Sequence, residues 1–172
     1  MTPAENGGAN VTRADVRGDT TNGHVDVVLA GPSGAVSSSD RDLVEEALVD
    51  KVIGPVETLD VFSASNNVQN IVYDLWVYDD VNLDSDTLKA KVDARLALLF
   101  SVAPIGGWKK TGDASGKVWK NLLESVIRSV TTRSFEVEVS SPAADVVLDI
   151  NDVPTKGTVG GTIHFETTPA TG

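Results

Sequence analysis

The order of hydrophobic and polar positions predicts a chain in which strands and helices interleave. Apolar and polar residues alternate over 11–16 and again over 24–30, and the turn formers of 19–23 separate the two runs. Alternation with this period places apolar side chains on one face of a strand, and a polar, glycine-containing segment between two such runs is typical of a hairpin. We therefore expect order to begin near Asn10 with an antiparallel pair of strands.

The next segment predicts a helix. Glycines and a proline at 31–34 break the second strand, and the hydroxyl and carboxylate groups of 37–40 offer N-cap acceptors. A stripe of apolar residues at helical spacing follows: Leu43, Val44, Ala47, Leu48 and Val52. Gly54-Pro55 should end the helix. A phosphate-binding loop at 31–34 is rejected because no Lys followed by Ser or Thr opens the helix, so this segment is expected to be a plain strand-to-helix turn.

Two strands are predicted over 57–64 and 68–78, and Asn66-Asn67 between them predicts a hairpin turn. The second strand has two different faces, one with Ile71, Tyr73, Leu75 and Val77 and the other with Val72, Asp74, Trp76 and Tyr78. Neither face is fully polar. Such a strand is usually covered on both sides, but it can also present its second face to a partner.

Two further helices are expected. The first follows cap candidates at 84–86, should end before Pro104, and carries an apolar stripe at Leu88, Val92, Leu96, Leu99 and Phe100. The second follows a loop at 105–116 and repeats an apolar residue every four positions, at Val118, Leu122, Val126 and Val130, with Trp119, Leu123 and Ile127 widening the stripe. A strand with Phe135, Val137 and Val139 on its apolar side comes next. It should pack on the helix that carries Val118, Leu122 and Val126.

Short strands at 146–150 and 162–166 complete the chain. The elements together predict the α+β class, with a mixed, largely antiparallel sheet and about three helices. One arrangement is the split βαβ order of ferredoxin-like folds. The alternative is two smaller modules that meet near 66–67.

Both ends of the chain are polar and lack apolar periodicity. We expect 1–9 to be a flexible N-terminal segment and 169–172 to be a flexible tail, with the folded module over 10–168. The chain has 172 residues and no Cys, so it can bury a core without disulfides and has no thiolate chemistry.

The net charge of the chain argues against two classes of binding partner. The formal net charge is -11, which repels nucleic-acid phosphates and anionic lipid head groups, so we expect neither nucleic-acid binding nor membrane insertion. The N-terminus has no basic start or apolar core of signal-peptide length, and no apolar run reaches bilayer length. These features predict a soluble protein made in the cytoplasm.

The search for chemistry finds no catalytic group. Asp80, Asn82 and Asp84 have the first three spacings of a calcium loop, but Ser85 stands where that loop needs Gly and Lys91 where it needs Glu. Asp84 or Ser85 is better explained as a helix cap. The two histidines, His24 and His164, lie in predicted strands and lack ligand spacing, so both are expected to face solvent. We expect no catalytic residue, no metal and no cofactor.

Several phrases of the sequence resemble one structural family. They are Val11-Thr-Arg-Ala-Asp-Val-Arg17, Gly23-His-Val-Asp-Val-Val-Leu-Ala-Gly-Pro32, Asp42-Leu-Val-Glu-Glu-Ala-Leu48, Thr58-Leu-Asp-Val-Phe-Ser-Ala64, Asn70-Ile-Val-Tyr-Asp-Leu-Trp-Val77, Ile105-Gly-Gly107 and Ser141-Pro142. In this order, with helices between them, they resemble the C-terminal half of the baseplate J-like family of contractile-tail phages. The resemblance covers roughly 10–168 and rests on element order and short hydrophobic phrases.

The resemblance implies a structural function. Members of this family are wedge components of the tail baseplate, in phages and in related contractile injection systems, and they hold neighbouring subunits without catalysis. It implies that this chain is a virion baseplate component made in the host bacterial cytoplasm, with other baseplate or tail subunits, or further copies of itself, as partners. The chain is shorter than a typical full-length member, which is compatible with a fragment, a split gene product or a truncated prophage copy.

Three aromatic residues are the candidate partner contacts, namely Trp76, Tyr78 and Trp108. They lie near a strand end or in a loop, where core packing need not bury them. The same residues support the alternative of a small-ligand or carbohydrate-binding α+β domain, in which they would serve as stacking surfaces. A flat aromatic patch favours the protein contact, and a concave pocket with convergent polar groups favours the ligand.

Overall fold

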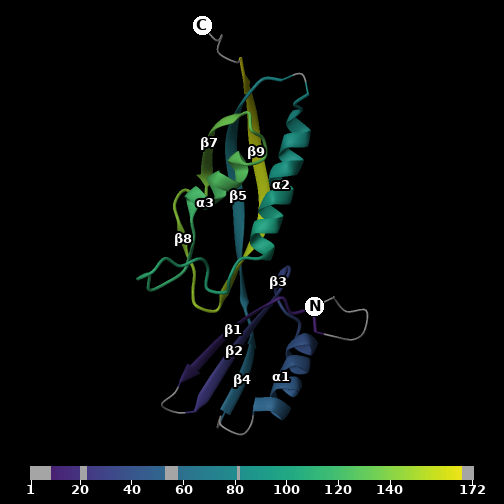
Figure 1. The fold of residues 1–172 in the computed structure, drawn as a ribbon, viewed down its shortest axis with the longest axis vertical. Coiled ribbons are helices and arrows are strands. Elements are labelled where there is room, and N and C mark those ends of the chain that lie inside the picture. The colour runs from purple at the N-terminus through teal and green to yellow at the C-terminus, as the bar shows by residue number, and fades with distance from the viewer. Residues whose placement is uncertain (1–8, 20–22, 53–57, 81, 168–172) are drawn as a thin grey trace.

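A computed structural model describes residues 9–19, 23–52, 58–80 and 82–167 (Figure 1). In chain order its elements are β1 (Arg13–Asp19), β2 (His24–Gly31), β3 (Gly34–Ala35), α1 (Ser38–Val52), β4 (Thr58–Ser63), β5 (Ser65–Tyr78), α2 (Ser85–Ser101), β6 (Lys117–Val118), α3 (Lys120–Arg128), β7 (Ser134–Ser141), β8 (Val146–Val147) and β9 (Asp152–Glu166). The α+β class is confirmed. Two expectations lie outside the described residues. They are the flexible ends at 1–9 and 169–172, of which only Ala9 is described, and the helix stop at Gly54-Pro55.

The N-terminal sheet is built on the expected hairpin. β1 and β2 pair antiparallel, and β4 pairs with β2 in parallel after the chain has crossed over through α1. The helix lies on one face of this sheet, where Val44 and Leu48 pack against the buried Val27, Leu29 and Val61. The apolar spacing that predicted the helix therefore also defines the side that faces the sheet.

The turn at 31–34 is tighter than expected. Instead of leading straight into the helix, it forms a hairpin in which Gly31 pairs with Gly34 and begins β3. Gly34 has a φ of 115°, and a Cβ there would lie 2.1 Å from Oδ1 of Asn66. Glycine is required at this position because both the backbone angle and the close side chain exclude a larger residue.

The hairpin expected between 57–64 and 68–78 is wrong. β4 hydrogen-bonds to β2, whereas β5 starts at Ser65 and enters a second sheet, so the chain continues through Ala64 without turning back. The asparagines lie inside β5. Oδ1 of Asn66 accepts a hydrogen bond from the Ala35 N–H at 2.7 Å, and Nδ2 of Asn67 donates to Asp152 at 2.9 Å. These tertiary contacts override the turn preference of Asn, and β4 and β5 join separate sheets in place of a single split βαβ sheet.

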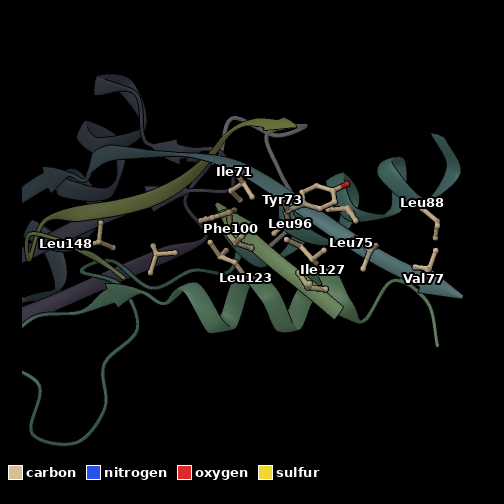
Figure 2. Packing of buried hydrophobic residues seen from close by; sticks show 14 residues of the cluster. Ile71, Tyr73, Leu75, Val77, Leu88, Leu96, Phe100, Leu123, Ile127 and Leu148 are labelled. Atoms are coloured by element: carbon tan, nitrogen blue, oxygen red, sulfur yellow. The ribbon is translucent and has the colours of Figure 1, made fainter. Parts of the chain in front are cut away.

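The C-terminal sheet has the order β7-β5-β9, with β5 antiparallel to β7 and parallel to β9. Both α2 and α3 lie on one side of it (Figure 1). The face of β5 that they cover carries the expected buried residues Ile71, Tyr73, Leu75 and Val77. Figure 2 shows Leu88, Leu96 and Phe100 of α2 packed with them, and Val92 of α2 belongs to the same cluster. This cluster is the main core of the protein.

The helix expected to begin near Val118 starts later, at Lys120, and Val118 belongs to β6. The face of α3 also differs from the expectation: Leu123 and Ile127 are fully buried, whereas Leu122 and Val126 are only half-buried. The strand β7 does pack on this helix. Its inward residues are Val137 and Val139, and Phe135 is not among them. Two of the three positions expected to widen the stripe, Leu123 and Ile127, are therefore the buried ones, and Trp119 is only half-buried.

β9 is far longer than the strand expected at 162–166, and it pairs with β5 almost from end to end. Its first half contains Pro154 and Gly157, which predict a break in the absence of tertiary information. Gly157 has a packing role, because a Cβ there would lie 2.3 Å from Oδ1 of Asn70 and 2.8 Å from a methyl group of Val68. The strand thus tolerates its glycine because the neighbouring strand fills the space.

The start of α2 offers a test of the cap. The Asp84 side chain accepts hydrogen bonds from the Thr87 N–H at 2.9 Å and from its hydroxyl at 3.0 Å, and these bonds lower the pKa of Asp84. We expect Asp84→Ala to lower the melting temperature by about 2–4 °C, because the helix loses one N-terminal acceptor. Asp84→Asn keeps an acceptor and should melt close to the parent. Equal melting of parent and Asp84→Ala would show that the cap contributes nothing.

Candidate interaction surface on the open sheet face

The C-terminal sheet has one face that the described helices do not cover. Because side chains alternate along a strand, the residues between the buried positions of β5 all point to this second side. We call it the open face, and it consists of Val72, Asp74, Trp76 and Tyr78 of β5, Glu136 and Glu138 of β7 with the neighbouring Phe135, and Thr162, His164 and Glu166 of β9. Val72 is 46% exposed although it is apolar.

Trp76 forms the centre of the open face together with His164. The two residues are direct partners in the β5–β9 register, and their rings stack with centroids 4.7 Å apart and planes 14° apart. Nε2 of His164 also lies 2.8 Å from Oδ1 of Asp74. The hydrogen bond and the stack hold the imidazole in place over the indole, so these side chains form a preordered surface.

Tyr78 forms a second aromatic pair with Phe135, with centroids 4.5 Å apart and planes 27° apart. A β-bulge explains how Phe135 reaches this position. Val77 pairs with Ser134 while Trp76 pairs with Glu136, so Phe135 is the extra residue between them. It is 37% exposed and lies outside the core cluster. Because of this bulge, the ring of Phe135 contacts Tyr78 instead of lying on the core side of β7, where the sequence predicted it.

Carboxylates border the aromatic centre. Glu136 and Glu138 on β7 and Glu166 on β9 are exposed, and the ion pairs of the described residues include none of them. An apolar, aromatic centre with a charged rim is the common arrangement of a protein interface. The acidic rim favours a partner surface with basic groups at the matching positions.

Two of the three predicted contact residues, Trp76 and Tyr78, lie on the open face. Trp108 lies elsewhere: it bridges to Lys117 and packs, half-buried, against the core cluster. The sequence did not indicate Phe135 and His164 as members of this contact surface. The alternation of His164 with its apolar neighbours was visible in the sequence, whereas the bulge that moves Phe135 depends on pairing with a strand about 60 residues earlier.

The N-terminal sheet carries an apolar hollow that we considered as a ligand site. It has a volume of about 380 Å³ and lies between the sheet and α1, lined by Val11, Ala14, Val16, Val25, Val27, Leu29, Val44, Leu48 and Leu59. Every lining residue is aliphatic. A carbohydrate or other polar ligand needs convergent donors and acceptors, which this lining does not supply.

The residues of the broken calcium pattern have other partners. Asp84 caps α2, while Asp80 accepts hydrogen bonds from Asn82 and pairs with Arg133 at 2.9 Å. Side chains that could bind a metal instead lie together on the N-terminal sheet, where His24 is beside Asp26 and Asp60. The sequence did not indicate this group, because Asp60 reaches His24 only through the parallel pairing of β2 with β4.

Comparison with known proteins gives no family assignment. No protein-family model matches the chain, and no curated protein matches it. Among the described residues, no helix is both long and apolar enough to cross a membrane.

Proposed function

We propose that this chain is a structural module that joins neighbouring protein subunits, and that its setting is the baseplate of a contractile phage tail or of a derived injection system. The open face carries the proposal, because it presents aromatic and aliphatic side chains that the described helices leave uncovered. The baseplate setting comes from the resemblance of the sequence to the baseplate J-like family.

The composition of the open face supports a protein partner. Tryptophan and tyrosine supply large contact areas with few rotatable bonds, and such residues dominate the binding energy of interfaces. Here Trp76 and Tyr78 are each fixed by a stacked neighbour. A partner would therefore meet a surface that loses little side-chain freedom on binding.

The arrangement of the sheets supports contact with more than one neighbour. The N-terminal sheet and the C-terminal sheet lie one after the other along the longest axis of the molecule (Figure 1). The open face belongs to the C-terminal sheet. A subunit that links others in an assembly needs separated surfaces. This elongated chain supplies them.

The alternative of a carbohydrate-binding domain has less support. Sugar stacking uses the free face of an aromatic ring, and His164 covers one face of Trp76 while Phe135 covers one face of Tyr78. The hollow under α1 has no polar lining to select a sugar. A protein surface, in contrast, can use both the ring edges and the acidic rim.

The test is a binding assay between the full chain and the products of its flanking genes. We expect Trp76→Ala to weaken binding by about tenfold or more, since a central aromatic anchor is worth at least 1–2 kcal/mol. The melting temperature should change little because Trp76 lies outside the core cluster. Affinity is measured by calorimetry or a quantitative pull-down, and stability by a thermal melt.

Trp108→Ala is the matched control, because it removes the same side chain from a place that the open face does not include. It should lower the melting temperature and leave the affinity of the folded protein unchanged. If Trp76→Ala binds as the parent does, or if that variant fails to fold, the open face is not the binding surface that we propose. Binding that depends on a soluble sugar would instead favour the carbohydrate reading.

A further inference from the structure

His24, Asp26 and Asp60 converge on one face of the N-terminal sheet. His24 and Asp26 are two residues apart on β2 and so point the same way, and Asp60 on β4 is the direct register partner of Asp26. One ligand atom from each residue lies within 4.8 Å of the other two. The backbone of two adjacent strands, and not a loop, positions all three.

The distances fit a shared cation. Nε2 of His24 lies 2.8 Å from Oδ1 of Asp26 and 3.5 Å from Oδ2 of Asp60. Zinc binds nitrogen and oxygen ligands at about 2.0–2.2 Å, which separates neighbouring ligands in a tetrahedral site by roughly 3.4 Å. The gap between His24 and Asp60 already has this length, and a small rotation of Asp26 would give it the same separation.

The second ring nitrogen of His24 has a partner that favours metal binding through the first. Nδ1 lies 2.5 Å from Oγ1 of Thr58, the register partner of His24 on β4. With its proton on Nδ1 and donated to that hydroxyl, the imidazole turns the lone pair of Nε2 toward two carboxylates. Three electron-pair donors facing one point repel each other unless a cation lies between them, and a histidine ligand is commonly oriented by such an outer hydrogen bond.

A proton makes fewer favourable contacts with His24, Asp26 and Asp60 than a divalent ion bound to all three would make. A proton on Nε2 makes one good hydrogen bond, to Asp26, and leaves Asp60 at 3.5 Å. The β1 residue across from Asp26 is Arg17, but its guanidinium bonds to Asp15 at 2.7 Å and to the Ile150 carbonyl at 2.6 Å. The formal net charge of -11 further favours the approach of a cation.

We propose that His24, Asp26 and Asp60 bind one first-row divalent cation, with Zn²⁺ as the best match. One imidazole and two carboxylates suit Zn²⁺, Co²⁺ or Mn²⁺ better than Ca²⁺ or Mg²⁺, which bind through oxygen. The side chains are 34%, 37% and 57% exposed, so the ion is reachable and water can complete its coordination. This site departs from the sequence expectation of no metal, and it is independent of the proposed interaction function.

The test is a calorimetric titration of the full chain with Zn²⁺ after treatment with a chelator. The parent should bind one ion per chain. His24→Ala and Asp60→Asn should each lower the affinity by about 100-fold or more, because each removes a direct ligand. Thr58→Val should lower it by about 10–100-fold, the usual effect of losing an outer partner of a ligating histidine, and Thr58→Ser should restore binding.

The second histidine gives a matched control. His164 also bonds to an aspartate, Asp74, but no second carboxylate joins that pair among the described ligand groups. His164→Ala should therefore bind Zn²⁺ as the parent does. In a magnetic resonance experiment, Mn²⁺ should broaden the imidazole signals of His24 and leave those of His164 sharp.

Three results would overturn the proposal. They are the absence of saturable 1:1 binding, binding that survives both His24→Ala and Asp60→Asn, and binding that His164→Ala reduces as strongly as His24→Ala. Asp60→Asn guards against a folding artefact, since this mostly exposed residue can be replaced by its amide without opening the core. Thermal melts without metal should show each variant folded.

Discussion

Gly161→Ala is expected to lower the free energy of unfolding by about 3 kcal/mol, near the upper end for adding a methyl group to a packed core. Gly161 on β9 is the register partner of Tyr73 on β5. A Cβ at position 161 would lie 2.3 Å from Cζ of Tyr73 and 2.4 Å from Cε1. The tyrosine ring is 1% exposed, so it cannot swing away without displacing α2 or the strand. Chemical denaturation measures the change.

The adjacent glycine supplies the control for this result. A Cβ at Gly160 would meet no atom within 4 Å, and its backbone needs no positive φ. Gly160→Ala should change the unfolding free energy by no more than about 0.5 kcal/mol, as at other surface positions. Similar losses in both variants would mean that flexibility of β9, and not the contact with Tyr73, requires the glycines.

Arg13→Met is expected to lower the free energy of unfolding by about 2 kcal/mol, because it removes charged donors from several backbone carbonyls at once. Arg13 on β1 donates from Nη1 to the carbonyls of Phe100, at 3.2 Å, and Ala103, at 2.7 Å, and from Nη2 to the Gly31 carbonyl. The carbonyl groups at the end of a helix lack intrahelical partners and carry partial negative charge. The guanidinium thus joins the N-terminal sheet to the end of α2.

Two features limit the size of this effect. Burial lowers the pKa of Arg13, and its Nε is buried without a hydrogen-bond partner among the described residues, so the native state already bears a desolvation cost that methionine would remove. Urea denaturation gives the change, and hydrogen exchange near the end of α2 should rise. Arg41→Met should have no measurable effect, because the ion pair of Arg41 among the described residues is with the neighbouring, exposed Asp42. An Arg13→Met variant as stable as the parent would show that the two sheets do not need this contact.

The sequence predicted those elements in which local chemistry and tertiary packing agree. The helix at 85–101 has a cap and a regular apolar stripe, and in the strand predicted over 68–78 the residues Ile71, Tyr73, Leu75 and Val77 share one face, so both were predicted with the right buried faces. The hairpin at Asn66-Asn67 failed because those asparagines bond to distant groups instead of to their own turn. The length of β9 was missed because its glycines fit against side chains of β5 that no local rule reveals.

For the candidate sites too, local patterns predicted some residues, whereas others depend on contacts between distant segments. Alternation along one strand was enough to place Trp76 and Tyr78 on a common face. The arrival of Phe135 beside Tyr78 needs a bulge, and the meeting of His24 with Asp60 needs the parallel pairing of two strands separated by a helix. Such contacts depend on register between distant segments, which hydrophobic spacing within a segment does not determine.

The pairing of β5 with β9 has a consequence for the time order of folding. β1, β2, α1 and β4 are all made before residue 65, so the N-terminal sheet can close early during synthesis. The central strand of the other sheet must wait, because its parallel partner is the last strand of the described chain and runs beside it over most of its length. Until β9 emerges from the ribosome, β5 has an unpaired edge beside its apolar face, and contacts of such long sequence separation form slowly. The interval between the synthesis of β5 and that of β9 is therefore the period in which this chain is most exposed to misassembly with other copies.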